Sequence, residues 1–356
     1  MKAGDPLILV INPGSTSTRI ALFRGEALVM QEETAHRAEE IDECTEFEEQ
    51  LALRGAAVRD FLARNGVDPG SLDSVVGRGG LLRPVAGGTY AVSKAMLEDA
   101  RAGVQGSHPS NLGCALAAAV ADLSGIPAFV VDPVSVDESE ELATYSGLDG
   151  VPRRPLSHAL SVHACARRFA GRRGVAVDDV NVVVAHLGGG ISVCPVMRGR
   201  IVDANNANSE GPFSPQRTGG LPLQECLDFV FESGLSRPEL EELTVRRGGL
   251  QSYLGTSDAR EVEARIASGD DRARSVYEAM AYQVAKEIGA MATVLDGSVD
   301  GVLLTGGLSR SDLLVRWITK RVEFIAPVHV IEGEEMSALA AGALHALRGD
   351  EPVLEY

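Results

Sequence analysis

The sequence is poor in cysteine, and the five cysteines that it has are scattered. They are Cys44, Cys114, Cys165, Cys194 and Cys226, an odd number without a Cys-x-x-Cys pair. Histidine is also scarce, with seven residues in 356 and no HxH or HExxH motif. Disulfide scaffolds and zinc sites need closely spaced or paired ligands. The pattern therefore argues against both and predicts reduced thiols that pack as small hydrophobic side chains, as in cytosolic proteins.

Long apolar runs are missing as well. The run at residues 7–11 is too short for the apolar core of a secretory signal. The stretch at residues 112–121 ends at Asp122, well short of the roughly 20 residues that a membrane-spanning helix needs. We therefore expect a cytoplasmic protein with no membrane partner.

Basic residues are outnumbered by acidic ones. The chain has 33 Lys and Arg against 50 Asp and Glu, a net charge of −17 at pH 7. Proteins that bind nucleic acid need a basic footprint, so the balance excludes nucleic acid as a partner. An acidic surface also repels anionic substrates, so any phosphate site in this chain must bring its own arginines.

The most informative feature that is present is an internal repeat. Residues 7–23 read LILVINPGSTSTRIALF, and residues 182–193 read VVVAHLGGGISV. Placing Asn12 on His186 fixes an offset of 174 residues, and at that offset both the glycine turns and the following Arg-Gly turns coincide without a gap. The two halves of the chain therefore carry related segments.

Each copy of the repeat predicts a strand, a Gly/Ser/Thr turn, a second strand, an Arg-Gly turn and a third strand. The predicted copies cover residues 7–32 and 181–206. Glycine turns let backbone N–H groups approach a phosphate closely, because no Cβ stands in the way. Two such hairpins, one in each half, predict a nucleotide gripped between two related domains and indicate a phosphotransferase.

The rest of the chain alternates between helical and strand patterns. Helical spacing of apolar residues is found at 45–64, 111–124, 158–168, 223–234, 237–245, 258–268, 271–295 and 337–348. Buried-type strands are expected at 74–77, 126–131, 300–304 and 328–331. This alternation predicts an α/β fold with two mixed sheets. We place the N-terminal domain at residues 1–134 plus 337–356 and the C-terminal domain at residues 135–336.

Several turns carry candidate phosphate-binding groups. The first, at residues 12–19, offers Asn12, the hydroxyls of Ser15 and Ser17, and the cation of Arg19. The others are Gly188, Gly189 and Gly190 in the second repeat, and Gly306 with Gly307 after a predicted strand. An ordinary hairpin turn, a β-bulge or a routine strand-to-helix turn would explain each of them separately. The turn-rich loop at residues 204–222 is long enough to predict a functional role.

Charged side chains next to these turns complete the candidate site. Arg78 and Arg217 are each flanked by glycine, which leaves them free to grip a carboxylate or phosphate. His158 and His186 adjoin the second glycine turn. Asp132 and Glu334-Glu335 follow predicted strands and could serve a hard divalent cation. Surface arginines, structural histidines and helix-capping acids remain the alternative reading of these residues.

Taken together, these motifs resemble the acetokinase family of the actin-like ATPase superfamily, which also includes sugar kinases and Hsp70. The resemblance spans residues 7–356 and rests on NPGSTST, GRGGLLRP, PQRTGGLP, HLGGGIS, TGGL and the Glu-Tyr end. It is closest to the butyrate kinases. Acetate kinases are similar but typically carry HLGNG at the fourth motif and are usually longer.

The resemblance implies two duplicated actin-like ATPase (ribonuclease H-like) domains with a nucleotide cleft between them. It implies reversible transfer of phosphate from ATP to butyrate with Mg²⁺, in a homo-oligomer. It assigns catalysis to Arg78, Asp132, His158 and Arg217, and the metal to Asn12 and Glu334. It assigns the nucleotide and its phosphates to Asn12, Ser15, Ser17, Arg19, His186, Gly188, Gly189, Gly190, Gly306 and Gly307. Arg19 departs from the family pattern, which usually has lysine there.

Two alternatives stay open from the sequence. One is a kinase for acetate, propionate or a branched-chain acid, because pocket walls that set chain length cannot be read from sequence. The other is a non-catalytic actin-like nucleotide-binding protein. The arginines distinguish the second alternative, since a nucleotide switch has no use for Arg78 and Arg217 directed at a second anion.

Overall fold

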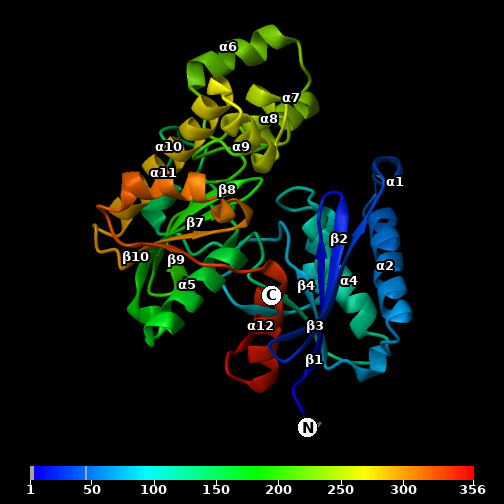
Figure 1. Ribbon diagram of the computed structural model, residues 1–356. Helices are drawn as coiled ribbons and strands as arrows, with labels where there is room; N and C mark the ends of the chain where they lie inside the picture. The colour runs from blue at the N-terminus through cyan, green and yellow to red at the C-terminus, as the bar shows by residue number, and fades with distance from the viewer. Residues whose placement is uncertain (1–3, 45) are drawn as a thin grey trace. The chain divides into compact units, whose positions relative to one another are not determined.

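The computed structural model describes residues 4–44 and 46–356, and its chain divides into two compact units (Figure 1). Unit 1 consists of Met1–Asp137 and Glu334–Tyr356, and unit 2 of Glu138–Gly333. These boundaries differ by three residues from the expected ones (137 against 134, and 334 against 337). Residues 135–137 belong to unit 1 because Val85 bonds to the backbone of Ser135 and Asp137.

Unit 1 is built on a seven-stranded mixed sheet in the order β12-β5-β6-β4-β1-β2-β3. Its strands are β1 (Leu7–Pro13), β2 (Ser17–Arg24), β3 (Ala27–Ala35), β4 (Ser74–Arg78), β5 (Thr89–Ala91), β6 (Ala128–Val131) and β12 (Val353–Leu354). The hairpin strands β1, β2 and β3 are antiparallel, whereas β4 runs parallel to both β1 and β6.

Helices lie against both faces of this sheet. They are α1 (Ala38–Glu43), α2 (Phe47–Arg64), α3 (Lys94–Ala102), α4 (Leu112–Ala121) and α12 (Glu335–Arg348), with short 3₁₀ turns at Pro69–Ser71 and Pro109–Asn111. Leu7, Leu9 and Ile11 of β1 pack into one core with α2 and α4. Side chains alternate along a strand, so Asn12 lies on the other face, where α12 contacts β1.

Unit 2 has a five-stranded mixed sheet in the order β11-β10-β7-β8-β9. Its strands are β7 (Asn181–Leu187), β8 (Ile191–Met197), β9 (Arg200–Ile201), β10 (Gly301–Thr305) and β11 (Val328–Val330). Its helices are α5 (Ala159–Arg173), α6 (Leu223–Ser233), α7 (Arg237–Val245), α8 (Gly249–Leu254), α9 (Ala259–Ala267), α10 (Asp271–Val294) and α11 (Asp312–Val322), with 3₁₀ turns at Glu141–Thr144, Val177–Asp179 and Gly307–Arg310. One large apolar core joins this sheet to α10 and α11.

The two sheets repeat the same topology. The order β3-β2-β1-β4-β6 in unit 1 matches β9-β8-β7-β10-β11 in unit 2, with the same parallel and antiparallel pairings. The starts of the first two strands are related by the predicted offset, since 7 + 174 = 181 and 17 + 174 = 191. The predicted duplication is confirmed and extends to two further strands beyond the repeat visible in the sequence.

One predicted strand is much shorter than expected. The third strand of the second repeat was predicted to run to residue 206, but β9 ends at Ile201. After β9, the side chain of Asn205 makes the hydrogen bonds to β8. It accepts one from the Val193 N–H at 2.6 Å and donates one to the Ile191 carbonyl at 3.0 Å. A side-chain amide thus replaces backbone pairing along β8 and frees the chain to form the following loop.

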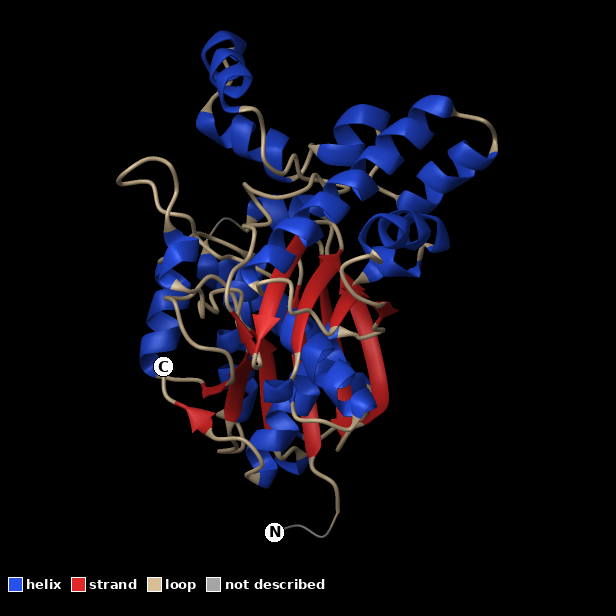
Figure 2. Cartoon of the chain, turned by 90° about the vertical axis from the view of Figure 1, so that its left-hand side faces the viewer, coloured by secondary structure: helices blue, strands red, loops and turns tan. Residues whose placement is uncertain are grey.

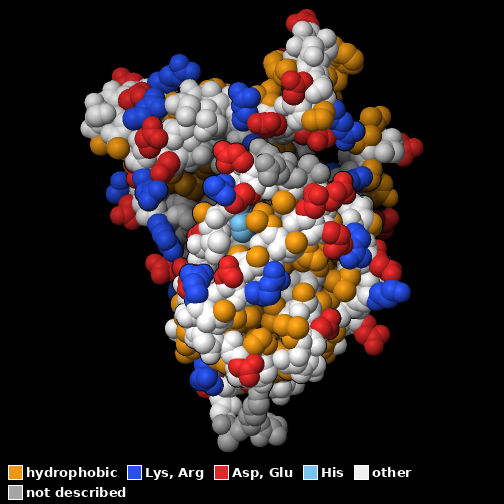
Figure 3. Space-filling view, turned by 90° about the vertical axis from the view of Figure 1, so that its right-hand side faces the viewer, with side chains coloured by type: hydrophobic (Ala, Val, Ile, Leu, Met, Phe, Trp, Pro, Cys, Tyr) orange, Lys and Arg blue, Asp and Glu red, His pale blue; other side chains and the backbone are white. Residues whose placement is uncertain are grey.

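The surface and the cysteines agree with the composition. Figure 2 shows helices packed around the strands, and no helix within the described residues is long and apolar enough to span a membrane. On the face drawn in Figure 3, basic side chains lie among acidic ones rather than in one basic area. All five cysteines are free. Burial raises the pKa of Cys114 to about 11 and that of Cys194 to about 12, so both remain thiols at neutral pH.

Candidate active site

In unit 1 the end of β1 meets the start of α12. The Asn12 amide donates a hydrogen bond to Glu335 Oε2 at 2.9 Å. Glu335 Oε1 lies 3.6 Å from Arg78 Nη2. One carboxylate therefore bridges the first turn motif and the first glycine-flanked arginine, which are 66 residues apart in sequence (78 − 12). We call Asn12, Arg78, Asp132 and Glu335 the unit 1 cluster.

Arg78 stands at the carboxyl end of β4 and is 5% exposed. Its guanidinium donates to the Asp132 carbonyl at 3.3 Å. Close packing of β4 against the N-terminus of α4 fixes its backbone, because a Cβ on Gly77 would lie 2.0 Å from the Gly113 carbonyl oxygen. The glycines around Arg78 are thus required by packing, which holds the backbone at the end of β4 against the first turn of α4.

Asp132 directly follows β6 and is fully buried. Its φ of 38° lies in the left-handed region, an uncommon conformation for a residue other than glycine. Two bonds to Gly88 hold it there: the Asp132 N–H donates to the Gly88 carbonyl at 2.9 Å, and Oδ1 accepts from the Gly88 N–H at 2.8 Å. Strained, buried carboxylates of this kind are concentrated at functional sites.

The serine-rich turn between β1 and β2 is organised by a neighbouring acid. Ser17 Oγ donates to Glu33 at 2.6 Å, and Arg19 lies 3.3 Å from the same carboxylate across the sheet. The Ser17 hydrogen bond and the charge of Arg19 hold the pKa of Glu33 below its ordinary value. Ser15 is exposed. Arg19 is therefore directed toward an exposed ion pair in this structure.

A buried arginine beneath this turn was not found from the sequence. Arg54 of α2 is fully buried and donates to the Ser17 carbonyl at 3.0 Å and to Thr18 Oγ1 at 3.1 Å. Thr18 Oγ1 also bonds to His36 Nε2 at 2.8 Å. Burial and the charge of Arg54 lower the pKa of His36. Arg54 is thus a positioning residue for the turn, and a mid-helix arginine gave no sequence signal of that role.

The structure distinguishes the two glutamates at the start of α12. Glu334 is the exposed residue that precedes the helix, and Glu335 is the half-buried first helical residue. Glu335 contacts both Asn12 and Arg78. Among the described residues no group of three or more His, Cys, Asp or Glu could hold a metal ion. Within the described residues, these side chains therefore form no metal site of three or more ligands.

In unit 2 the two candidate histidines lie together. The rings of His158 and His186 are stacked, with centroids 4.1 Å apart and planes 15° from parallel. His158 precedes α5, and its Nδ1 lies 2.9 Å from Ser192 Oγ. Ser192 is fully buried on β8, directly opposite His186 in the ladder. The hairpin thus supplies both the stacking partner and the hydrogen-bond partner of His158.

The glycine run of the second repeat packs against Arg217. A Cβ on Gly190 would lie 2.5 Å from Arg217 Cζ, and a Cβ on Gly189 would lie 3.1 Å from Gln216 Oε1. Ser214 ties the two segments together, since its hydroxyl donates to the Gly189 carbonyl at 2.6 Å and accepts from the Arg217 N–H at 3.1 Å. Arg217 is desolvated here, which lowers its pKa. Because the glycines have no side chains, the Arg217 guanidinium can pack directly on the backbone of this run. We call His158, His186, Gly188–Gly190 and Arg217 the unit 2 cluster.

The second glycine turn of unit 2 follows β10. Gly306 has a φ of 88°, and a Cβ there would lie 2.5 Å from the Leu187 carbonyl oxygen at the end of β7. Gly307 faces open space, with nothing within 4 Å of a Cβ. The first glycine is required by the fold, whereas the second leaves backbone available to a ligand.

A second missed residue holds the long loop after β9. Arg153 reaches Asp203 at 3.1 Å, Glu210 at 3.1 Å and the Ala204 carbonyl at 3.0 Å. Burial raises the pKa of Asp203 despite the nearby arginine. The loop predicted to be functional is therefore tied down at its start by a charged network, and Arg217 lies near its other end.

The comparisons with known proteins agree with this architecture. Residues 146–327, slightly more than half of the chain, match the Acetokinase family. A protein of Caldanaerobacter subterraneus subsp. tengcongensis named "Probable butyrate kinase 2" is 48% identical over 345 residues, covering 97% of this chain and 98% of that protein. A Listeria monocytogenes serotype 4a protein named "Probable butyrate kinase" is 45% identical, covering 98% of this chain and 99% of its own. The chain belongs to the acetokinase family.

Solved structures show the same fold at lower identity. A Porphyromonas gingivalis acetate kinase superposes with a TM-score of 0.78 at 19% identity, over 96% of this chain and 100% of its own. A Francisella tularensis propionate kinase gives 0.75 at 17% identity, over 95% of this chain and 98% of its own. These matches confirm the predicted fold of duplicated actin-like ATPase domains.

Proposed function

We propose that this chain is a butyrate kinase, which transfers the γ-phosphoryl group of ATP reversibly to the carboxylate of butyrate and yields butyryl phosphate and ADP. Relatives that carry this name share 45–48% identity over nearly the whole chain. The observation that carries the proposal is the pair of arginines. On a protein with a net charge of −17, Arg78 is buried against Asp132 and Glu335, and Arg217 packs on the glycine run of the second repeat.

The chemistry requires no general base. A carboxylic acid with a pKa of about 4–5 is already ionised at neutral pH, so its oxygen is a ready nucleophile. In the transfer, a carboxylate oxygen forms a bond to the γ-phosphorus while the bond to the β,γ-bridging oxygen breaks and ADP leaves with that electron pair. The obstacle is the approach of one anion to another, so catalysis consists of positioning and charge neutralisation. A covalent phospho-enzyme is not needed.

We assign the following roles to the unit 1 cluster. Arg78 binds the carboxylate or the transferring phosphoryl group. The backbone carbonyl of Asp132 accepts a hydrogen bond from Arg78 and so holds the arginine in position, and the side-chain carboxylate of Asp132 belongs to the same catalytic set. Asn12 and the glutamates at 334 and 335 serve the metal region. Mg²⁺ takes oxygen ligands, keeps several waters and is usually held by one or two carboxylates, which fits a donor set of this size. When bound, Mg²⁺ neutralises phosphate charge.

We assign binding of the nucleotide phosphates to the unit 2 cluster, which also contains Arg217, the second of the two arginines. The backbone of Gly188–Gly190 and Gly307 faces the phosphates, Arg217 stabilises the transferring group, and the stacked His158 and His186 donate hydrogen bonds to it. Ser15, Ser17 and Arg19 contribute from the first turn of unit 1. We also expect a cytoplasmic homo-oligomer.

Trapping with hydroxylamine tests this function directly. The purified chain is incubated with ATP, Mg²⁺, hydroxylamine and each straight-chain acid from two to five carbons, and the acyl hydroxamate is quantified. Butyrate is expected to give the highest kcat/KM. Because one methylene changes discrimination by only about 1–3 kcal/mol, the neighbouring acids retain measurable turnover. A clear preference for acetate, propionate or a branched acid would assign the chain to that kinase instead. No hydroxamate with any acid would leave the non-catalytic nucleotide-binding alternative.

A further inference from the structure

Helix α6 buries none of its residues within the chain. Leu223, Leu227 and Phe231 are 68%, 41% and 84% exposed. Spaced by four residues, they form a single apolar stripe along the helix. Asp228 and Glu232 each come directly after a stripe residue in sequence, so both acids lie along one side of the stripe. In Figure 1, α6 lies beyond α8 and α9 at the end of unit 2, far from the strands β7 and β8.

A helix without a buried apolar face is only marginally stable by itself. Isolated helices shorter than about 12–15 residues are marginal in water, and helices in proteins owe their stability to the packing of an apolar face. The following helix, α7, also buries no residue. Leu221, just before α6, and Phe229, on the opposite side of the helix from Leu227, are also exposed, at 47% and 48%. An exposed apolar stripe on a helix without a buried face marks an interaction site.

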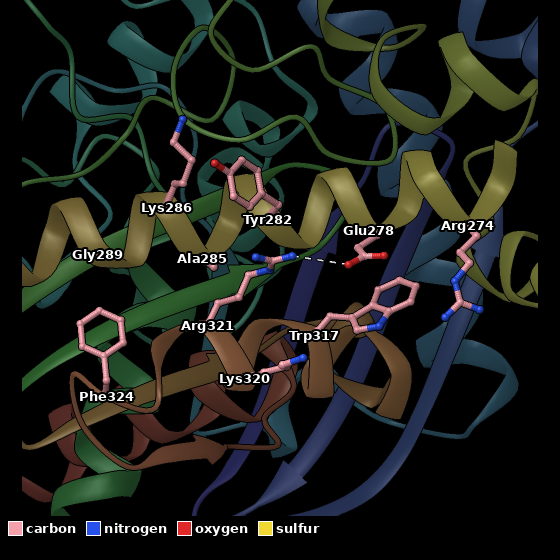
Figure 4. Close-up of a pocket in the computed structure, with 10 residues that line it drawn as sticks. All are labelled: Arg274, Glu278, Tyr282, Ala285, Lys286, Gly289, Trp317, Lys320, Arg321 and Phe324. Carbon is pink, nitrogen blue, oxygen red and sulfur yellow. Dashed lines mark hydrogen bonds and ion pairs between the residues drawn. The ribbon is translucent and has the colours of Figure 1, made fainter. Parts of the chain in front are cut away.

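A complementary surface lies elsewhere on unit 2, in a groove between α10 and α11. The groove has a volume of about 760 Å³. Figure 4 shows side chains from one face of α10 opposite those of α11 and the residues just after it. Four of the charged side chains that line it are basic and only one, Glu278, is acidic. The basic ones are Arg274, Lys286, Lys320 and Arg321. Arg321 pairs with Glu278 at 3.4 Å, which leaves a local excess of positive charge on a chain with a net charge of −17.

The groove is also aromatic. Arg274 lies 5.9 Å from the ring of Trp317, and Tyr282 is flanked by Lys286 at 5.6 Å and Arg321 at 5.1 Å. Phe324 at one end is 83% exposed. Cations next to aromatic faces keep both groups in place. The result is an apolar floor with positively charged edges, which is the counterpart of an apolar stripe with an acidic edge.

We infer that α6 of one copy of this chain docks into the α10–α11 groove of a second copy, with the stripe on the aromatic floor and Asp228 and Glu232 against the basic edges. An amphipathic helix laid into an apolar groove is a recurrent mode of recognition. Every copy carries both the helix and the groove. In a twofold-symmetric pair each helix would occupy the groove of the other copy, so that two such contacts would form and the pair would close on itself. This interface is independent of the proposed catalytic function.

The first experiment measures self-association of the full chain by sedimentation and light scattering. Phe231→Asp is expected to raise the dissociation constant at least tenfold, because it places a charge on the aromatic floor. Leu142→Asp is the matched control, since Leu142 is 83% exposed and lies outside both surfaces, and it is expected to leave association unchanged. Circular dichroism checks that both variants are folded. A monomeric wild-type chain, or equal association of the two variants, would overturn the inference.

A charge exchange identifies the two partners. The double variants Lys320→Glu/Arg321→Glu and Asp228→Lys/Glu232→Lys are each expected to self-associate at least tenfold more weakly than the wild type. When the two variants are mixed, they are expected to regain association. At one contact the charge-reversed helix meets the charge-reversed groove, and at the other contact the helix and the groove both have their original charges. Added salt weakens all of these contacts. If the mixture associates no better than either variant alone, α6 and the groove are not partners.

Discussion

The imidazole rings of His158 and His186 are stacked 4.1 Å apart, although 28 residues separate them in sequence (186 − 158). Ser192, which faces His186 across the ladder, lies 2.9 Å from Nδ1 of His158. A hydrogen bond on one ring nitrogen sets which tautomer is present and hence what the other nitrogen can donate. Ser192 is thus a positioning residue for the unit 2 cluster.

Ser192→Ala is expected to lower kcat roughly two- to tenfold, the rate equivalent of one hydrogen bond of about 0.5–1.5 kcal/mol. His158→Ala removes the donor itself and is expected to cost more. Steady-state kinetics with butyrate measure both effects, and thermal unfolding reports on folding. A Ser192→Ala enzyme with unchanged kcat would show that the orientation of His158 does not matter.

Arg78→Ala and Arg217→Ala are each expected to reduce kcat about 10²–10³-fold, because each removes a preorganised donor to a doubly anionic transition state. Binding of ATP, measured by calorimetry, is expected to change little. The control is Arg64→Ala, whose side chain is 61% exposed and pairs with Glu32 at the surface, where ion pairs contribute about 0–1 kcal/mol. Near-wild-type turnover in Arg78→Ala or Arg217→Ala would remove that arginine from the mechanism.

Gly190→Ala is expected to resemble Arg217→Ala. The added methyl group would lie 2.5 Å from the Arg217 guanidinium carbon, so the cation must move while the glycine turn itself stays in place. Gly171→Ala, on α5, meets nothing within 4 Å and is expected to stabilise the helix by about 0.5–1 kcal/mol without changing kcat. If Gly190→Ala keeps full activity, the packing of Arg217 on the glycine run is not needed for catalysis.

Glu335→Gln is expected to raise the Mg²⁺ concentration required for half-maximal activity more than Glu334→Gln does. Glu335 is the glutamate that contacts Asn12 and Arg78, whereas Glu334 is exposed before the helix. Activity is titrated with Mg²⁺ at fixed ATP for both variants and for Asp132→Asn. Removal of Mg²⁺ with a chelator is expected to abolish transfer in the wild type. If all three variants keep the wild-type magnesium dependence, the metal is held elsewhere.

The sequence predicted the duplicated hairpins because turn glycines and apolar alternation are local signals. Further duplication was visible only in the sheets, where β4 and β10 occupy the same position and place Arg78 and Thr305 at equivalent strand ends. Helices α3, α8 and α11 were not predicted. In α11 the signal is present, since Leu314, Ile318 and Val322 recur at four-residue spacing and are buried, whereas α8 spans only six residues.

The site was predicted less completely than the fold. Gly190 was expected to face a phosphate, yet its lack of a side chain also accommodates Arg217, a contact between segments that no local pattern reveals. Arg54 looks like a solvated helix residue in sequence but is fully buried under Ser17 and Thr18. The short β9 likewise depends on Asn205, whose side chain reaches another strand. Long-range contacts of this kind are decided by tertiary packing.

The most direct test of the account is to follow the phosphoryl group itself. Purified chain is mixed with ATP, Mg²⁺ and butyrate, and the reaction is observed by ³¹P NMR. The account predicts that an acyl phosphate resonance grows as the γ-phosphate resonance of ATP falls, and that added ADP reverses the change. Release of inorganic phosphate without an acyl phosphate, or no loss of ATP, would contradict the assignment of this chain as a carboxylate kinase.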